Sequence, residues 1–517
     1  MNAAAANFSL ALSQLPLFLG QHVLLALSSL GLGIAISLPL AIAAARIGWL
    51  RGPALATASV IQTIPGLALL ALFYPILLAL SAFTMQTFGV GFRALGFLPA
   101  LLALTLYAML PILRNTVIAI EGIDATTLQA ARAVGMTPMQ SLLRVELPLA
   151  APVIMAGIRT AAVWVIGTAT LSTPVGQTSL GNYIFTGLQT ENWIFVLFGC
   201  GAAAALALAV DRALGLAESG FSRRSPRRLI GAAAAMAVIL AAGLPTPRQQ
   251  GRASIVVGTK NFEEQYILGA LLEQRLRAAG LPTTRRDGLG SSILFHALAA
   301  NDVDVYVDYA GTIWTNQMHR TDQPGREAML AEMTAWLKQR HGITLLARLG
   351  FENAYTLAMR PDSASRLGVT TLTDLARVAS GLSIGGDYEF FGRPDWAATA
   401  GTYGLHFARM RQYQSNFLYK AVRDGDVDVI SAFSSDGRIA QYGLRLLADP
   451  LSALPPYDAV ILLSPRLADA PELRAALAAL RGAISLETMQ HANLMVDQEH
   501  DKASPEAAAT WLNDQLR

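Results

Sequence analysis

The chain changes character near residue 250, and no single fold accommodates both halves. Up to about Pro245 long apolar runs dominate, whereas Ser254–Arg517 alternates short apolar segments with charged ones. Apolar runs of about 20 residues are long enough to cross a bilayer, while the second pattern is typical of a soluble α/β domain. The sequence therefore predicts an all-α transmembrane bundle of about six helices followed by a soluble α/β domain.

Composition and charge agree with a protein that is partly in lipid. The mean hydropathy is +0.41, and only 15% of the 517 residues are charged, which is too apolar for an ordinary soluble protein. The formal net charge is only +3, and the arginines stand mainly beside apolar segments. This distribution follows membrane topology and gives no support to nucleic-acid binding.

Six apolar segments have the length expected of membrane spans. They are His22–Ala45, Ala54–Leu80, Leu98–Ile120, Ala150–Leu171, Ile194–Leu214 and Leu229–Leu244, of which the last is short.

Basic residues in the short loops set the orientation. Arg46 and Arg51 place the first loop in the cytoplasm, and Arg132 and Arg144 place the third loop there. The fifth loop is assigned to the same side by a cluster of four: Arg223, Arg224, Arg227 and Arg228. With an external N-terminus, six crossings then place the soluble half outside the cytoplasm.

The sequence gives little support to a metal site or to an enzyme active site. The single cysteine, Cys200, lies in an apolar run, so the soluble half has neither disulfides nor thiolate metal sites. The histidines show no metal-ligand spacing, and no Ser or Cys nucleophile stands in a recognisable motif. We therefore expect no metal, no cofactor and no catalytic residues.

The third cytoplasmic loop has the pattern of a helix, a tight turn and a second helix. A row of alanines makes a thin helix face, and Gly135 can end that helix. Thr137 is placed to cap the next helix, with Pro138 in its first turn and Gln140 completing a capping box. Such a loop is a rigid lever on the cytoplasmic side.

This loop resembles the signature loop of ABC-importer permeases. Glu-Ala-Ala, a Gly and a later Leu-Pro define that signature, and here Gln129 stands where the family usually has Glu. The resemblance assigns the coupling role to Gln129, Ala130, Ala131, Gly135, Leu147 and Pro148. It implies that the loop seats in a separate ATP-hydrolysing subunit, because the sequence has no phosphate-binding Gly-rich loop of its own. It also implies a homodimer, formed through the membrane domain.

The soluble half contains a degenerate duplication. Phe295–Tyr309 and Tyr419–Phe433 each read as a helix, a turn, an Asp-Val-Asp strand start and an aromatic residue at the strand end. Upstream, Gly258 and Gly385 close matching apolar strands. Strand–loop–helix repeats build parallel sheets, whose ligands collect beyond the carboxyl ends of the strands. The sequence thus predicts two lobes that face each other across a cleft.

The soluble half resembles type II periplasmic-binding-protein-like domains for quaternary ammonium compounds such as glycine betaine, choline and carnitine. The matching stretches are Gly258–Gln265, Asp308–Thr312 and Ser434–Arg438. Together with the loop of the membrane half, they imply an ABC importer for osmoprotectants in the cell inner (plasma) membrane.

A trimethylammonium group has charge but no N–H, so aromatic faces select it better than hydrogen bonds do. Four residues at strand ends or lobe crossovers match the aromatic box of the resembled family: Tyr309, Tyr355, Phe433 and Tyr457. The duplication places Tyr309 and Phe433 without appeal to a family. Phe433 stands where Tyr is frequent, which keeps the aromatic face and loses a hydroxyl.

A ligand that also carries a carboxylate needs an anion clamp, and the resemblance assigns this role to Lys260, Thr312 and Arg393. Alternatively, Arg393 is a structural partner of Glu389 or Asp395. Asp387 and Asp436 are candidates to pair with a ligand cation, although Asp436 is also placed to order its own Asp-Gly turn.

The ligand is left open among glycine betaine, proline betaine, carnitine, choline and an aromatic betaine such as ergothioneine. The clamp favours betaines over choline, which lacks the carboxylate. A ligand-gated channel or receptor also couples a two-lobed domain to a pore, but the sequence has no repeated carbonyl-type filter, and the coupling loop favours the pump.

These interpretations give three parts to the chain. Residues 1–222 form the permease domain, 223–253 the last span and a tether, and 254–517 the substrate-binding domain. Lobe 1 comprises about 254–353 and 456–517, and lobe 2 about 354–455. The tether Pro245–Ala253, fully extended, reaches roughly 30 Å, which keeps the receptor near its pore.

Overall fold

The structure is a computed structural model that describes residues 3–92, 94–190, 192–223, 225–243, 254–320, 322–387, 390–498 and 501–516. The chain divides into two compact units. One comprises Ser9–Phe185 and Phe195–Arg248, and the other Met1–Phe8, Thr186–Ile194 and Gln249–Arg517. The predicted tether Pro245–Ala253 lies outside the described residues, as do Arg224 and Glu389.

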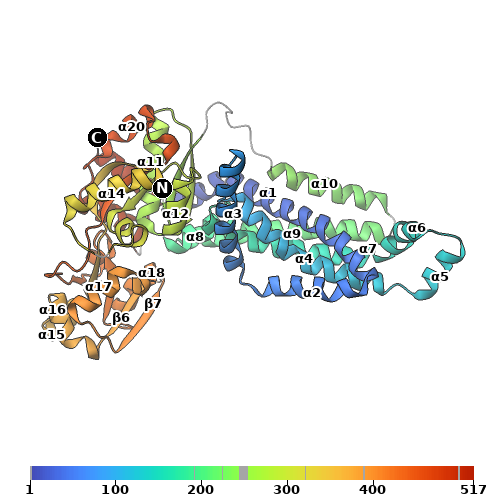
Figure 1. Ribbon diagram of the computed structural model, residues 1–517, viewed down its shortest axis with the longest axis horizontal. Coiled ribbons are helices and arrows are strands. Elements are labelled where there is room, and N and C mark those ends of the chain that lie inside the picture. The colour runs from blue at the N-terminus through green and yellow to red at the C-terminus, as the bar shows by residue number, and fades with distance from the viewer. Residues whose placement is uncertain are drawn as a thin grey trace. The chain divides into compact units, whose positions relative to one another are not determined.

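The described residues of the first unit form helices joined by loops, with no strand among them. Its α-helices are α1 (Ala3–Arg46), α2 (Gly48–Thr63), α3 (Gly66–Phe88), α4 (Phe97–Glu121), α5 (Ala125–Ala133), α6 (Pro138–Ser141), α7 (Leu147–Ala169), α8 (Gly181–Gln189), α9 (Trp193–Ser222) and α10 (Pro226–Gly243). Figure 1 shows the long helices α1, α4, α7, α9 and α10 running alongside one another as a bundle.

Within the described residues, five helical segments are long and apolar enough to cross a membrane: Asn7–Arg46, Gly66–Phe88, Phe97–Glu121, Pro138–Val175 and Trp193–Ser222. The predicted sixth span, Leu229–Leu244, coincides with α10, which has 18 residues but is not among the five. At 1.5 Å per residue such a helix is about 27 Å long, close to the thickness of a bilayer core.

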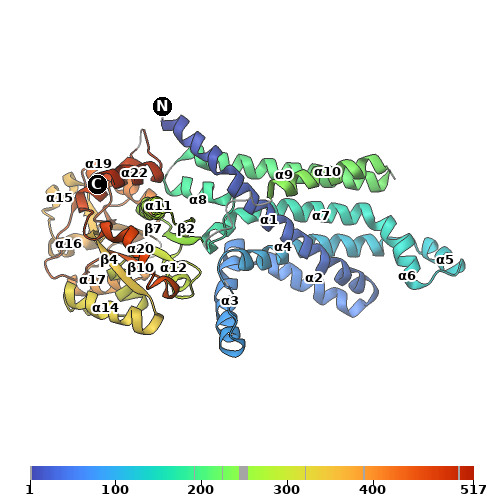
Figure 2. The same cartoon turned by 90° about the horizontal axis from the view of Figure 1, so that it is seen from above.

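The predicted second span, Ala54–Leu80, is wrong as a single helix. The chain leaves the helical conformation at Ile64, which is extended with a ψ of 127°, and α3 starts after Pro65. A residue that precedes proline is pushed out of the α region by the proline ring, so α2 ends here. As a result α3 lies across the direction of α4 and α7 in both views (Figure 2).

The core of the bundle is the contact between α4 and α7. Gly157 permits it, because a Cβ at that position would lie 2.8 Å from the backbone oxygen of Pro111 in α4. Arg159 of α7 is tied to α9 through Asp211 at 2.9 Å and Glu218 at 2.7 Å. Charged side chains in an apolar bundle are stabilised when they pair in this way, so the ion pairs hold α7 and α9 together.

The second unit contains two lobes, whose elements form separate groups in Figure 1. The first lobe contains β1 (Ile255–Lys260), α11 (Glu263–Ala278), β2 (Thr283–Leu289), α12 (Ser291–Ala299), β3 (Val305–Tyr309), α13 (Ala310–Thr312), α14 (Arg326–His341), β4 (Thr344–Glu352), β10 (Asp458–Leu463), α20 (Pro471–Leu477), α21 (Leu486–Asp497) and α22 (Pro505–Gln515). The second contains β5 (Tyr355–Met359), α15 (Pro361–Leu367), α16 (Leu372–Val378), β6 (Ser383–Asp387), α17 (Pro394–Tyr403), β7 (Arg409–Tyr413), α18 (Ser415–Asp424), β8 (Val429–Phe433), α19 (Arg438–Gln441) and β9 (Arg445–Leu446).

Each lobe is built on one five-stranded sheet, in the orders β2-β1-β3-β10-β4 and β7-β6-β8-β5-β9. The sheets are mixed rather than purely parallel. In the first, β10 runs antiparallel to both β3 and β4, and in the second β5 runs antiparallel to β8 and β9. The antiparallel strands are those at the crossings between lobes, where the simple strand–helix–strand repeat is interrupted.

The duplicated segments occupy equivalent positions in the two lobes. Asp304 accepts a hydrogen bond at 2.8 Å from the backbone N–H of Val256, and Asp428 accepts one at 2.8 Å from that of Ser383. A Cβ at Gly258 in β1 would lie 2.5 Å from Leu294 of α12, and one at Gly385 in β6 would lie 2.9 Å from Leu418 of α18, so each duplicated helix packs directly on the strand that carries the matching glycine. The repeat therefore brings β3 and β8 to corresponding places, with an aromatic residue at the end of each.

Candidate functional site

The four predicted aromatic residues lie close together. Tyr355 starts β5 and pairs across the sheet with Phe433 at the end of β8, and their ring centroids are 4.6 Å apart. Tyr457 precedes β10, with its ring 5.7 Å from that of Tyr355. Strand ends of both lobes thus contribute to one aromatic cluster.

Phe262 connects Tyr309 to this cluster. Its ring lies 6.1 Å from that of Tyr309 and 6.3 Å from that of Phe433, to which it is parallel within 1°. A second additional ring, Phe390, lies 5.2 Å from Tyr355. The sequence analysis did not select either residue, although Phe262 falls within the Gly258–Gln265 stretch.

Lys260 is buried at the end of β1, with 2% of its surface exposed. Its Nζ donates to Asp308 at 2.5 Å and stands 5.2 Å from the centre of the Tyr309 ring. The predicted clamp lysine is therefore one half of a buried ion pair, and it covers an aromatic face.

Arg393 is arranged in the same way. Its Nε donates to Asp395 at 2.9 Å, and its guanidinium stands 5.0 Å from the Tyr355 ring and 6.0 Å from the Tyr457 ring. The Tyr457 hydroxyl donates to Asp395 at 2.7 Å. Asp395 is thus a structural partner of Arg393, one of the two that the sequence suggested; the other, Glu389, lies outside the described residues.

Thr312 is buried in α13, the short helix that directly follows Tyr309. The residue before it, Gly311, has no room for a side chain, because a Cβ there would lie 2.7 Å from atoms of the Tyr457 ring. Close backbone approach at Gly311 therefore lets the Tyr457 ring pack beside this segment.

Buried carboxylates surround the rings. The Tyr309 hydroxyl donates to Glu264 at 2.5 Å, and the Tyr355 hydroxyl donates to Asp387 at 3.2 Å. Burial raises the pKa of Glu264 above its usual range, although hydrogen bonds to the carboxylate oppose the shift. Asp436 instead binds its neighbour Arg438, through both the backbone N–H and the guanidinium.

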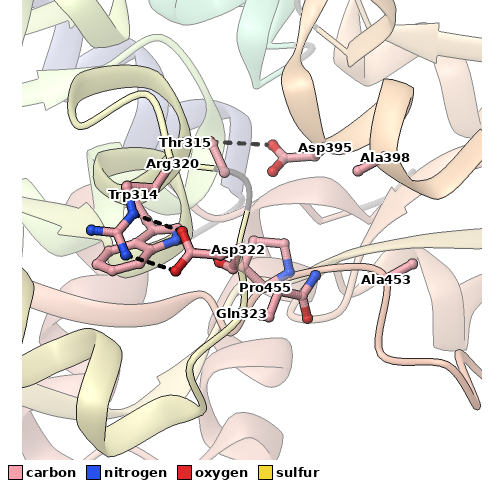
Figure 3. A pocket seen from close by; sticks show the side chains of 9 residues that line it. All are labelled: Trp314, Thr315, Arg320, Asp322, Gln323, Asp395, Ala398, Ala453 and Pro455. Atoms are coloured by element: carbon pink, nitrogen blue, oxygen red, sulfur yellow. Dashed lines mark hydrogen bonds and ion pairs between the residues drawn. The ribbon is translucent and has the colours of Figure 1, made fainter. Parts of the chain in front are cut away.

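Two openings adjoin the cluster. One is lined by Trp314, Thr315, Arg320, Asp322, Gln323, Asp395, Ala398, Ala453 and Pro455. In Figure 3, Thr315 donates toward Asp395, the same carboxylate that holds Arg393. The other is lined by Phe262, Glu263, Glu264, Asn353, Phe433, Ser435, Asp436, Arg438, Asn493 and Asp497. The second opening therefore shares Phe262 and Phe433 with the aromatic cluster, whereas the first is linked to it through Asp395, which accepts the hydrogen bond of the Tyr457 hydroxyl.

The predicted helix–turn–helix of the membrane half has the expected local geometry. Gly135 has a φ of +79°, in the left-handed region that glycine tolerates. Thr137 caps α6, with Gln140 completing the capping box and Pro138 in the first turn. In both views α5 and α6 lie together at one end of the bundle (Figures 1 and 2).

This loop presents apolar side chains to its surroundings. Val134 is 72% exposed, Met139 61% and Leu143 58%. Of the six predicted coupling residues, Gln129, Ala130, Gly135 and Pro148 are exposed, Leu147 is partly buried and Ala131 is buried. Exposed apolar groups of this kind are typical of a docking surface.

Comparisons with known proteins divide the chain as its two patterns do. Residues 36–223 match the family model described as binding-protein-dependent transport system inner membrane component. Residues 253–514 match the model described as substrate binding domain of ABC-type glycine betaine transport system.

Similar proteins cover either the whole chain or one half. The ergothioneine transport permease/ergothioneine binding protein EgtU of Helicobacter pylori is 29% identical over 88% of this chain and 82% of its own length. The choline transport system permease protein OpuBB of Bacillus subtilis is 37% identical over 40% of this chain and 89% of its own length. A crystal structure of a glycine betaine/carnitine/choline ABC transporter is 26% identical, covers 51% of this chain and 100% of its own, and has a TM-score of 0.45.

The family matches account for both halves at once, and neither describes an enzyme. The chain belongs to the binding-protein-dependent transport permeases and, through its second half, to the substrate-binding domains of ABC-type glycine betaine transport systems.

Proposed function

We propose that this protein imports a betaine, a small molecule that carries both a quaternary ammonium group and a carboxylate. The convergence of four aromatic residues from the strand ends of two lobes carries this proposal. Tyr309, Tyr355, Phe433 and Tyr457 would hold the ammonium group, because aromatic faces attract a cation that has no hydrogen to donate. The coarser function, an ABC importer component for quaternary ammonium compounds, follows from the family.

Charge at the cluster supports a zwitterionic ligand. Lys260 and Arg393 each pair with a buried aspartate and each cover an aromatic face. A betaine offers both a cation for the rings and a carboxylate for the basic side chains. Thr312, which is buried in α13 directly after Tyr309, would donate its hydroxyl to the same carboxylate.

Several betaines remain candidates for the substrate. The relative that spans most of the chain is an ergothioneine transporter, while relatives of the separate halves are named for choline, carnitine and glycine betaine. Glycine betaine is the smallest of these ligands with both a trimethylammonium group and a carboxylate, and ergothioneine adds a ring to the same two groups. Choline has no carboxylate for Lys260 and Arg393, so we expect it to bind more weakly.

The source of energy lies in another subunit. A permease of this family works with an ATPase, and we infer that the exposed apolar side chains around Gly135 dock on it. Gln129, Ala130, Ala131, Leu147 and Pro148 complete the proposed coupling surface. The membrane domain is proposed to form a homodimer, and the binding domain lies on the extracytoplasmic side of the plasma membrane.

Calorimetry on the detergent-solubilised full chain tests the ligand assignment. Glycine betaine, carnitine and ergothioneine are titrated against choline, and at least one betaine should bind more tightly than choline. The variant Thr312→Val should weaken betaine binding and leave choline unchanged, whereas Thr399→Val, at another buried threonine, should change neither. Choline as the tightest ligand would overturn the carboxylate clamp.

A further inference from the structure

The opening beside Phe262 and Phe433 contains buried acceptor oxygens that lack a donor. Oε1 of Glu263, Oδ1 of Asn353 and Oδ1 of Asn493 have no hydrogen-bond partner among the described residues. The three residues are 4%, 5% and 3% exposed, and all of them line this opening. Leaving buried acceptors unpaired costs free energy, so several in one place indicate a partner that the chain itself does not supply.

Neighbouring contacts fix the orientation of these groups. The side-chain nitrogens of Asn353 and Asn493 donate to Glu264 at 3.0 and 2.9 Å, and that of Asn493 also donates to the backbone oxygen of Ser435 at 2.8 Å. Because the nitrogens are held in this way, the amide oxygens are the groups left over. Neither amide can rotate to satisfy itself without breaking its bonds to Glu264.

The other carboxylate oxygen of Glu263, Oε2, faces Arg438. It lies 3.9 Å from the guanidinium of Arg438, and that guanidinium makes two closer hydrogen bonds to Asp436, at 3.0 and 2.6 Å. Arg438 therefore directs its nearest donors at Asp436, and Oε1 of Glu263 is left as an acceptor.

The opening is continuous with the aromatic cluster. Phe262 and Phe433 belong to both, and Glu264, which also lines the opening, accepts the hydrogen bond of the Tyr309 hydroxyl. The space in it that a water-sized group can occupy is about 20 Å³, which is room for one hydroxyl or another small polar group. A ligand whose cationic end contacts the rings can thus place another group here.

We propose that this opening is a subsite for an N–H or O–H donor group of the substrate, so that the preferred substrate is a betaine with such a donor. The inference rests on the proposed function. A trimethylammonium group has no hydrogen to donate, and a carboxylate would be repelled by Glu263. Glycine betaine, which has only those two groups, leaves the subsite unused, whereas a hydroxyl or a ring N–H satisfies the acceptors.

A matched pair of ligands tests the subsite on the unmodified full chain. L-Carnitine and γ-butyrobetaine differ by one hydroxyl, and ergothioneine adds a ring N–H; glycine betaine completes the set. At pH 8, where Glu263 is charged, we expect carnitine or ergothioneine to bind at least about tenfold more tightly than γ-butyrobetaine and glycine betaine, because hydrogen bonds to a charged acceptor are strong. Equal affinities, or tightest binding of a donor-free betaine, would overturn the subsite and leave the proposed function standing. Binding of none of the four would reject both.

A substitution at Glu263 tests whether this residue causes the preference for donor-bearing betaines. Glu263→Gln removes the charge of the acceptor and keeps its size, so the affinity for the preferred donor-bearing ligand should fall several-fold while that for γ-butyrobetaine stays unchanged. Glu273→Gln makes the same change further along α11, where Glu273 accepts from Arg277, and should alter neither. An equal loss for both ligands in Glu263→Gln would show a merely structural role and overturn the assignment.

Discussion

Tyr309 joins the two kinds of contact on which the binding site depends. Its ring faces Nζ of Lys260 at 5.2 Å, and its hydroxyl is held by Glu264 and Gln265. The ring is available to a cation only if Lys260 moves or shares the face. The two parts of this side chain can therefore be separated experimentally.

We predict that Tyr309→Ala weakens ligand binding between several-fold and about 30-fold, because a desolvated cation–π contact is worth about 2 kcal/mol. Tyr309→Phe keeps the ring and loses the hydroxyl, so its affinity should stay within about twofold of the unmodified protein. Calorimetry with the tightest betaine measures both. If both variants bind as the unmodified protein does, Tyr309 is not part of the cage.

Glu263 makes stability depend on pH. Burial raises its pKa from 4.5 to about 7, against the opposing charge of Arg438 and with Asp436 and Lys502 also contributing. The folded protein then binds a proton that the unfolded chain releases above about 4.5. Stability from this group is fully present below that pH and is lost as the pH rises through 7.

Glu263→Gln removes this dependence. From pH 5 to pH 8 the unmodified protein should lose stability relative to the variant, on the order of 1–3 kcal/mol. Thermal unfolding of the ligand-free full chain, followed at the transition of the α/β unit, measures the difference. Burial raises the pKa of Asp497 as well, so some pH dependence should remain in the variant. Parallel pH profiles of the two proteins would contradict the prediction.

At the scale of elements, the coupling loop was predicted in detail because capping and left-handed turns are local properties of the sequence. The capping box at Thr137 and the positive φ of Gly135 are both confirmed. The duplication likewise located Tyr309 and Phe433 at corresponding strand ends. Tyr355 and Tyr457, by contrast, came only from the resemblance, since no repeat marks them.

One failure is local, and the others arise because hydropathy and spacing do not register contacts between distant segments. The apolar run Ala54–Leu80 hid the break at Pro65, although the residue before a proline gives a local signal. Phe262 was missed because its stacking partner Phe433 comes from the other lobe. The bonds of Asn353 and Asn493 to Glu264 join three segments that no motif connects.

We predict that Gly135→Ala reduces ATP-driven uptake and leaves ligand binding unchanged. No atom lies within 4 Å of the added Cβ, so the cost is backbone strain in the left-handed region, about 1 kcal/mol or more. Gly52→Ala adds the same atom in α2 where the space is equally open, and it serves as the control. Equal uptake by the two variants would argue against a coupling role for the turn.

The helix α10 is predicted to cross the membrane, although it is shorter than the five candidate spans. In a Cys200→Ala background, Ser225→Cys precedes the helix and Ser254→Cys lies at the start of the binding domain. A membrane-impermeant thiol reagent should label Ser254→Cys in intact cells and reach Ser225→Cys only after the membrane is opened. Labelling of both from outside would rule out the crossing.

At the scale of the whole molecule, the chain combines a substrate-binding domain with a permease domain. The family matches supply the permease and the binding domain, and the sequence has no phosphate-binding Gly-rich loop. A pump of this design must stop when its ATPase is removed, whereas a ligand-gated channel would still conduct. That difference separates the two classes of function.

Uptake of a radiolabelled betaine into proteoliposomes tests the central claim most directly. The full chain is reconstituted with and without its ATPase subunit, in the presence of ATP or a non-hydrolysable analogue. Accumulation against a gradient should require both the ATPase and hydrolysable ATP. Betaine flux that persists without the ATPase would contradict the account and favour a channel.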